Sequence, residues 1–107
     1  MNCCPRQACL SSRRLPPPLP QRLRELAYAP FVEMLRANMR HAGALRLDHV
    51  MALMRLFWVH PEHGPKAGAY VSYPLEELLG ILALESRRHR CLVVGEDLGT
   101  VPPQVRE

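Results

Sequence analysis

Two short apolar runs, each followed by acidic residues, stand out along the chain. The first is Ala44-Leu45-Arg46-Leu47-Asp48-His49 and the second is Leu92-Val93-Val94-Gly95-Glu96-Asp97. Both have the length and composition of a strand, on which successive side chains point to opposite faces. Arg46 therefore shares a face with Asp48, and Glu96 follows an apolar column formed by Leu92 and Val94. If the two strands are parallel neighbours, both carboxylates lie at the same edge of the sheet.

Helical spacing of apolar residues predicts two helices before the first run. A short helix is expected over residues 21–26 and a longer one over residues 31–41, with Pro30 in its first turn and Gly43 at its close. The apolar stripe of the longer helix is expected to pack into the core. Its members are Phe31, Met34, Leu35 and Met39.

A third helix is expected to begin at Pro74, with Ser72 or Tyr73 as its cap, and to end near His89. Its first turn is acidic and its last turn is basic, as the helix dipole favours. Its apolar stripe, which would pack on a sheet, consists of Leu75, Leu78, Leu79 and Leu82. This helix would cross over between the two strands, which predicts an α/β fold built on a right-handed strand-helix-strand unit.

The segment between the first strand and the third helix has a weaker pattern. Residues 50–59 are apolar enough to be buried, as a short helix or as an irregular loop wall. Residues 60–68 contain Pro and Gly at several positions and are expected to form a turn-rich loop.

The two strand ends carry the candidate chemistry. A guanidinium two residues from a carboxylate on the same face holds it ionised and aims it, so Arg46 would act on Asp48. With Glu96 at the same edge, the arrangement is that of a nucleophile and a general acid in outline. The alternative is structural: Asp and Glu at strand ends also cap loops, and Arg46 with Asp48 would then be an ordinary ion pair.

Two other groups of residues could bind metal. His60 and His63 could do so with Glu62, but a Pro/Gly loop holds ligands poorly, so solvated histidines are expected. Three of the four cysteines lie in the first nine residues, which is not a zinc-site spacing, and Cys91 is expected in the core. We therefore expect no metal and no cofactor. This cysteine usage suits a reducing cytoplasm.

The net charge of +4 comes from the start of the chain. Five basic residues and no acidic ones occur up to Arg24, whereas nine of the 14 basic and all 10 acidic residues follow. Residues 25–107 lack the basic stripe with aromatics that a nucleic-acid partner would require. The sequence also has no apolar run of the 18 or so residues that span a bilayer, so no membrane partner is expected.

The start of the chain differs in composition from the rest. Residues 1–14 lack the apolar core of a secretory signal and are expected to be a disordered leader, a transit peptide being the alternative. The run Leu15-Pro16-Pro17-Pro18-Leu19-Pro20 is either a linker or a polyproline II ligand for another domain.

Four stretches follow one another along the chain: Ala44-Leu-Arg-Leu-Asp-His-Val-Met51, Gly68-Ala-Tyr-Val-Ser-Tyr-Pro74, Ile81-Leu-Ala-Leu-Glu-Ser86 and Gly95-Glu-Asp-Leu-Gly-Thr-Val-Pro102. Together they resemble the 4-α-glucanotransferases, the amylomaltases or disproportionating enzymes of glycoside hydrolase family 77. The resemblance covers residues 15–107. It implies a fragment of a (β/α)₈ TIM barrel around strands four and five, with the barrel incomplete in this chain.

The resemblance also implies roles for single residues. Asp48 would be the catalytic nucleophile, Glu96 the general acid/base, and Arg46 the residue that orients the nucleophile. His49, Trp58 and Tyr70 are candidates to line the glucan groove, although Trp58 and Tyr70 are equally candidates for the core. The substrate would be a malto-oligosaccharide or α-glucan, cleaved and transferred by a retaining double displacement with carboxyl groups about 5 to 5.5 Å apart.

Departures from the family pattern are small, and the missing parts are large. Leu47 replaces the usual Ile, Phe57 replaces a common Trp, and His60-Pro61 replaces a simpler Pro turn. The family's third carboxylate, an Asp after a His on a later strand, is absent from this sequence. We therefore expect the isolated chain to be inactive. The alternative is a non-catalytic truncated remnant whose basic, Pro-rich leader has at most an interaction role.

Overall fold

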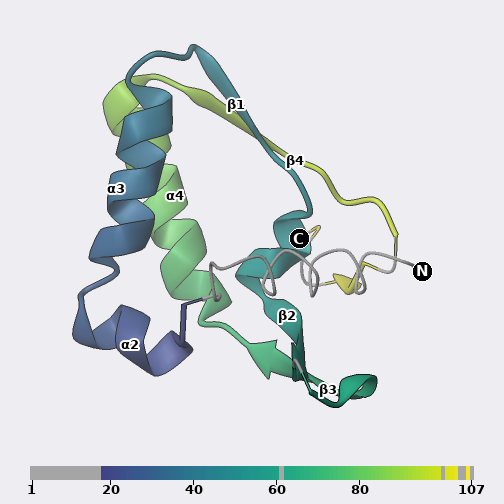
Figure 1. The fold of residues 1–107 in the computed structure, drawn as a ribbon. Helices are drawn as coiled ribbons and strands as arrows, with labels where there is room; N and C mark the ends of the chain where they lie inside the picture. Colours follow the sequence, from purple (N-terminus) through teal and green to yellow (C-terminus); the bar gives the residue numbers. More distant parts are fainter. Residues whose placement is uncertain (1–17, 61, 100, 104–105, 107) are drawn as a thin grey trace.

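The computed structural model describes residues 18–60, 62–99, 101–103 and 106. The expectations for the leader, its cysteines and residues 15–17 therefore lie outside the described residues. Along the chain the elements are α2 (Pro20–Glu25), α3 (Ala29–Met39), β1 (Ala44–Leu47), the 3₁₀ helix η1 (Val50–Leu53), β2 (Arg55–His60), β3 (Gly64–Ser72), α4 (Leu75–His89) and β4 (Leu92–Gly95) (Figure 1).

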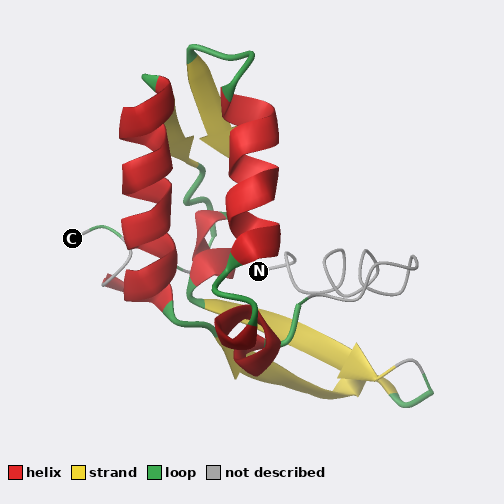
Figure 2. Ribbon diagram, turned by 90° about the vertical axis from the view of Figure 1, so that its left-hand side faces the viewer, coloured by secondary structure: helices red, strands yellow, loops and turns green. Residues whose placement is uncertain are grey.

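The predicted strand-helix-strand unit is present. Strands β1 and β4 pair in parallel, with Ala44 opposite Leu92 and Leu47 opposite Gly95. Helices α3 and α4 stand side by side in front of this pair in Figure 2. Side chains from the helix-facing side of the strands, such as Leu45, Leu47 and Val93, pack against the buried cluster of Leu35, Met39, Leu82 and Cys91. The core position predicted for Cys91 is confirmed, since only 2% of the residue is exposed.

The prediction for residues 50–68 was largely wrong. A short helix does form over Val50–Leu53, but Arg55–His60 and Gly64–Ser72 form an antiparallel hairpin in place of a loop. The run in β2 is rich in aromatic and β-branched residues, which suit a strand, yet its partner lies across a turn that the local pattern does not reveal. Gly68 permits the close pairing, because a Cβ at this position would lie 2.5 Å from the Phe57 ring.

The helix ends differ in detail from the prediction. Helix α4 begins at Leu75, and its N-cap is Pro74, without a side-chain capping bond. Ser72 does not cap the helix because it belongs to β3, where it pairs with Arg55. Helix α3 has Pro30 in its first turn, as predicted, but ends at Met39, four residues before Gly43.

The two apolar stripes are narrower than predicted. Met34 of α3 is 48% exposed, and Leu79 of α4 is 40% exposed. The buried positions are Leu35 and Met39 on α3 and Leu78 and Leu82 on α4. Phe31 of α3 and Ile81 of α4 are partly buried and pack against the cluster that contains Leu35, Met39 and Leu82.

A buried carboxylate joins the two long helices. Glu85 of α4 is 1% exposed and accepts two hydrogen bonds from Arg36 of α3, each 3.0 Å long, and one from Arg88. The Arg36 hydrogen bond and, to a smaller extent, Arg88 lower the pKa of Glu85, although burial acts in the opposite direction. Glu85 is therefore a charged anchor inside an otherwise apolar interface.

Within the described residues, none of the helices is long and apolar enough to cross a membrane.

Candidate active site

The carboxyl ends of β1 and β4 meet at one edge of the parallel pair. Because Leu47 lies opposite Gly95, the next residue on each strand is a carboxylate, Asp48 on one side and Glu96 on the other. Two backbone hydrogen bonds hold the strand ends together: Glu96 N–H donates to the Leu47 carbonyl at 2.8 Å, and Val50 N–H donates to the Glu96 carbonyl at 2.9 Å. The predicted placement of both carboxylates at one edge is confirmed.

Arg46 and Asp48 interact on the predicted face of β1. The Arg46 Nε donates to Asp48 Oδ1 at 2.8 Å, and the two side chains are 67% and 77% exposed. An ion pair this exposed contributes little to folding stability. Its main effect is to orient the carboxylate.

Backbone amides hold the side chain of Glu96. His49 N–H donates to Oε2 at 2.8 Å, and Leu98 N–H donates to Oε1 at 3.1 Å. The two bonds fix the direction in which the carboxyl group points. Next to it, Arg106 Nε donates to Asp97 Oδ2 at 2.8 Å, which fastens the segment that follows Glu96.

The apolar column expected behind Glu96 is not buried. Leu92 is 65% exposed and Val94 is 51% exposed, because these side chains lie on the face of β4 turned away from α3 and α4. Within the part of the chain that the structure describes, no element covers that face. The column therefore does not remove water from around Glu96.

His49 occupies a tight turn between the two carboxylates. Its backbone is left-handed (φ 53°), which directs its amide to Glu96, and its Nδ1 is buried without a hydrogen-bond partner among the described residues. Gly95 leaves room for this turn, since a Cβ there would lie 3.0 Å from Val50 Cβ. Sequence reasoning selected His49 for its ring but missed the role of its amide; the only local signal was a glycine just before Glu96.

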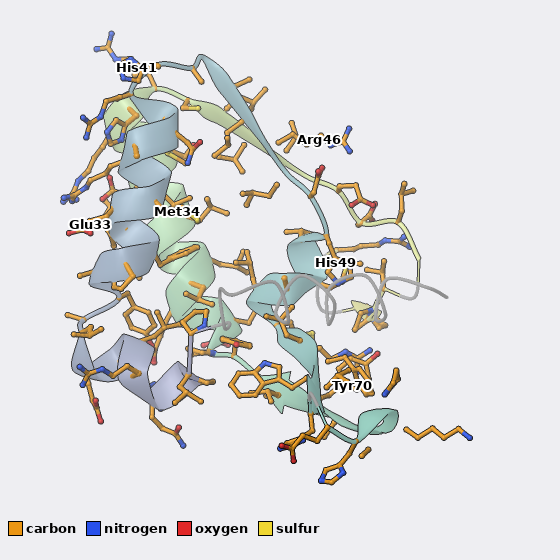
Figure 3. The ribbon with its side chains drawn as sticks, in the orientation of Figure 1. Glu33, Met34, His41, Arg46, His49 and Tyr70 are labelled. Atoms are coloured by element: carbon orange, nitrogen blue, oxygen red, sulfur yellow. The ribbon has the colours of Figure 1, made fainter. Side chains whose placement is uncertain are left out.

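The two aromatic residues proposed for the groove lie on opposite faces of the hairpin. Tyr70 is 53% exposed, meets the Phe57 ring edge to face at 5.1 Å, and lies under the Arg55 guanidinium at 4.6 Å. Figure 3 shows Tyr70, His49 and Arg46 along the same side of the molecule, away from Glu33 of α3. Trp58 instead follows the other face and lies near Tyr73, between the hairpin and α2.

The structure thus brings Arg46, Asp48, His49 and Glu96 together, with Tyr70 on the same side and Trp58 elsewhere.

A second group of ligand-type side chains lies at the hairpin turn. His60, Glu62 and His63 are exposed, and each offers a donor atom within 4.8 Å of the others. The two imidazole rings stack at 4.6 Å, and Glu62 N–H donates to His60 Nδ1. These residues could hold a metal ion, but our prediction is still that both histidines are solvated and bind none.

Two carboxylates at one strand edge, one paired with a guanidinium and one held by amides, are suited to nucleophilic and proton-transfer steps at a single bond. The model of glycoside hydrolase family 77, described as 4-alpha-glucanotransferase, matches residues 14–107. The chain belongs to this family. The resemblance noted in the sequence is therefore confirmed.

Known 4-alpha-glucanotransferases agree with this assignment. The enzyme of Haemophilus influenzae is 54% identical over 92 residues, which cover 86% of this chain and 13% of that protein. The enzyme of Mycobacterium tuberculosis is 49% identical over 92 residues, with the same coverage. In the crystal structure of amylomaltase from Corynebacterium glutamicum, 12% of the chain matches 81% of this one, with a TM-score of 0.77 and 44% identity. This glucanotransferase-family chain therefore spans about 13% of the length of its curated relatives.

Proposed function

We propose that this chain is the segment of a 4-α-glucanotransferase that carries the nucleophile and the general acid/base. The observation that carries the proposal is the register of β1 and β4, which sets Asp48 and Glu96 at one edge. In this proposal β1 and β4 are strands four and five of a (β/α)₈ barrel, whose chemistry lies at the carboxyl ends of its strands. The substrate is an α-1,4-glucan, and a cytoplasmic location stays a prediction.

In the first step, Asp48 attacks the anomeric carbon of the donor glucan. A covalent bond forms between its oxygen and that carbon while the glycosidic bond breaks, and Glu96 gives its proton to the leaving oxygen. The hydrogen bond from Arg46 aims the Asp48 carboxylate before the attack. The donor fragment released at this stage has a new free 4-OH.

In the second step, the 4-OH of an acceptor glucan attacks the covalent intermediate. Glu96, now a carboxylate, takes the proton of that hydroxyl, and the bond to Asp48 breaks. Two inversions retain the configuration at the anomeric carbon. The bonds from the His49 and Leu98 amides hold Glu96 in one direction, and Tyr70 is a candidate surface for a sugar ring.

The chain alone is not expected to carry out this reaction. Leu92, Val94 and Leu98 are 65%, 51% and 72% exposed on and beyond β4, so the site lacks one wall in the part of the chain described here. Parallel sheets are normally covered on both faces. We therefore expect purified chain and maltotriose to give no ladder of maltodextrins, and the appearance of a ladder would refute this expectation.

The proposed function is tested in a chimera. The 92 matched residues of the Haemophilus influenzae enzyme are replaced by those of this chain, and disproportionation of maltotriose is measured. We expect an active chimera that loses activity with Glu96→Gln but not with Glu76→Gln, an exposed glutamate in the first turn of α4. A chimera that folds but stays inactive, or a Glu96→Gln chimera that keeps its activity, would contradict the proposal.

A further inference from the structure

The amino ends of β1 and β4, away from the carboxylate edge, carry a group of exposed arginines. Helices α3 and α4 lie side by side, and each ends just before one of these strands. Leu92 N–H donates to the Gly43 carbonyl at 2.9 Å, which joins the two connecting turns. In Figure 3, His41 marks this end of α3. We call the group the arginine end, and its members are Arg36, Arg40, Arg87, Arg88 and Arg90.

The arginine end concentrates positive charge that is spread out along the sequence. Nine basic residues follow Arg24, and five of them belong to this group. Residues 36–43 and 85–91 contain one acidic residue, Glu85, so the net charge of the two segments is +4 with neutral histidines. Positive charges gathered on one surface raise the local potential, so an anion bound there would be attracted by several guanidiniums at once.

Buried Glu85 holds two of these guanidiniums in place. Arg36 Nη2 and Arg88 Nη1 both donate to Glu85 Oε1 at 3.0 Å, so the two cationic groups lie next to each other. Their side chains are still 46% and 54% exposed, which leaves part of each guanidinium accessible to an anion. One carboxylate therefore neutralises one of two positive charges but fixes both, and groups that are already fixed lose less entropy when they bind a ligand.

The other three arginines have no ion-pair partner within the part of the chain that the structure describes. Helix dipoles favour cations at helix C-termini, so helix stability accounts in part for Arg40 and Arg87. It does not account for Arg90, whose backbone is left-handed (φ 50°) at the end of α4. Glycine adopts this conformation at lower cost and is the common residue after a helix. The arginine at this position therefore points to a use for its side chain.

The chemistry of the arginine end favours phosphate groups. A guanidinium binds phosphate through two parallel hydrogen bonds, and all five cations here are arginine. A protein partner would need apolar or aromatic anchors, and a single-stranded nucleic acid would need aromatic rings for its bases. Residues 36–43 and 85–91 expose no large apolar side chain and contain no Phe, Tyr or Trp. One phosphate occupies only one or two guanidiniums, so five arginines on two helix ends fit a chain of linked phosphates.

We infer that the arginine end binds a linear oligophosphate through its phosphate groups alone, whether the oligophosphate is free or is the tail of a nucleotide. Arg36 and Arg88, fixed by Glu85, take one phosphate between α3 and α4. Arg40 and Arg90, at the ends of the two helices, take the neighbouring phosphates. Binding makes and breaks no covalent bond. This inference does not rest on glucan transfer.

Titration calorimetry of the full chain with tripolyphosphate, in about 0.15 M NaCl to screen weak surface attraction, tests the inference. We expect saturable binding that the double variant R40Q/R90Q weakens by about 10²-fold, since each charge-assisted contact is worth about tenfold. The matched control is R13Q/R14Q, which removes the same charge from the start of the chain and should bind as the wild-type chain does. Absence of saturable binding in the wild-type chain, or an equal loss in the control, would overturn the proposal.

Competing ligands identify what the surface recognises. ATP without magnesium should bind within about threefold of tripolyphosphate, orthophosphate should bind at least about tenfold more weakly, and adenosine should not bind. Much tighter binding of ATP would show that the base is recognised, and equal binding of orthophosphate would show a site for a single phosphate. Tighter binding of a duplex RNA that R40Q/R90Q abolishes would assign the surface to nucleic acid. Each of these three results would overturn the proposal.

A second measurement applies if R40Q/R90Q loses its far-UV circular dichroism signal. The NMR signals of the arginine Nε–H groups are then followed in the wild-type chain as tripolyphosphate is added. The signals of Arg36, Arg40 and Arg90 should shift with one common dissociation constant, and that of Arg46 should not. Shifts confined to other arginines would overturn the proposal.

Discussion

Two arginine–carboxylate pairs with the same chemistry lie in two contrasting regions of the molecule. At the edge of β1 and β4, Arg46 holds Asp48 in a pair that is more than half exposed on both sides. Between α3 and α4, Arg36 holds Glu85 by two bonds, and Glu85 is 1% exposed. Exposure makes the first pair nearly neutral for folding and available to a substrate, whereas burial makes the second important for folding and unavailable. The effect of an arginine–carboxylate pair therefore depends on its burial. Mutation of the exposed pair should lower activity, whereas mutation of the buried pair should lower stability.

The largest effect is expected at the exposed pair. In the chimera, Asp48→Asn removes the carboxylate that we propose as the nucleophile, and it should lower the rate of maltotriose disproportionation by about 10⁴-fold or more. The free energy of unfolding should change by less than about 0.5 kcal/mol, because the side chain is exposed. Steady-state assays and urea unfolding measure the two quantities. A large loss of stability with normal activity in Asp48→Asn would contradict the role that we assign to the exposed pair.

Arg46→Met should have the second-largest effect, again on rate. The guanidinium orients Asp48, and a small misplacement of a reacting group costs about 10²-fold. We expect that loss in kcat with little change in KM, and Arg46→Lys should recover part of it because it keeps the charge. A stability change above about 1 kcal/mol would show that the pair is structural, which is the alternative that the sequence left open.

Glu85→Gln should show the converse response at the buried pair. It keeps the shape of the side chain but leaves Arg36 and Arg88 without a charged partner, so we expect a loss of about 1 to 3 kcal/mol in the free energy of unfolding. Urea unfolding of the chain, followed by circular dichroism, measures this loss. Glu76→Gln on the exposed face of α4 is the control, with an expected change within about 0.5 kcal/mol.

The pH dependence of stability sharpens the same contrast. The hydrogen bond from Arg36 holds the pKa of Glu85 below its ordinary value of 4.5 in the folded chain. A lowered pKa contributes stability that is fully present above the unfolded value and is lost as the pH falls through the folded value. Unfolding free energy should therefore fall more steeply with acid below about pH 4.5 in the wild-type chain than in Glu85→Gln. Equal slopes of unfolding free energy against pH in the two chains would show that Glu85 does not cause the acid sensitivity.

The smallest effects are expected from two glycines, one in each region. Gly95→Ala would bring a Cβ within 3.0 Å of Val50 and should destabilise the carboxylate edge by about 1 kcal/mol. Gly80→Ala on α4 meets nothing within 4 Å and should stabilise the helix by about 0.5 to 1 kcal/mol. Thermal unfolding of both variants measures the difference, and shifts of the same sign would contradict the geometry at the edge.

The carboxylate edge was predictable from the sequence because it depends on local patterns. Strand periodicity placed Arg46 and Asp48 on one face, and the apolar stripe of α4 identified the crossover helix. The hairpin was not predictable, since β2 pairs with β3 across a turn and the continuous apolar run from Leu56 to Val59 lacks the alternation of a half-buried strand. The pairing of β2 with β3 places Trp58 and Tyr70 on opposite faces of the hairpin, so their separation could not be predicted either.

The burial of Glu85 could not be predicted from the sequence for a different reason. Glu85 lies among basic residues at the end of α4, and such a glutamate usually belongs to a solvated helix face. Only the position of Arg36, 49 residues away, turns it into a buried partner. The hydrogen bond from the His49 amide to Glu96 could not be predicted from the sequence either, because it depends on a left-handed backbone and not on a side chain.

The most direct test of the central claim is to trap the covalent intermediate. A chimera with Glu96→Gln is incubated with an α-maltosyl fluoride, whose leaving group needs no proton, so the first step proceeds and the second is slow. Digestion and mass spectrometry should find the sugar on the peptide that contains Asp48, and the Asp48→Asn chimera should carry none. A label on another carboxylate, or turnover in the Asp48→Asn chimera, would contradict the assignment of the nucleophile to this strand edge.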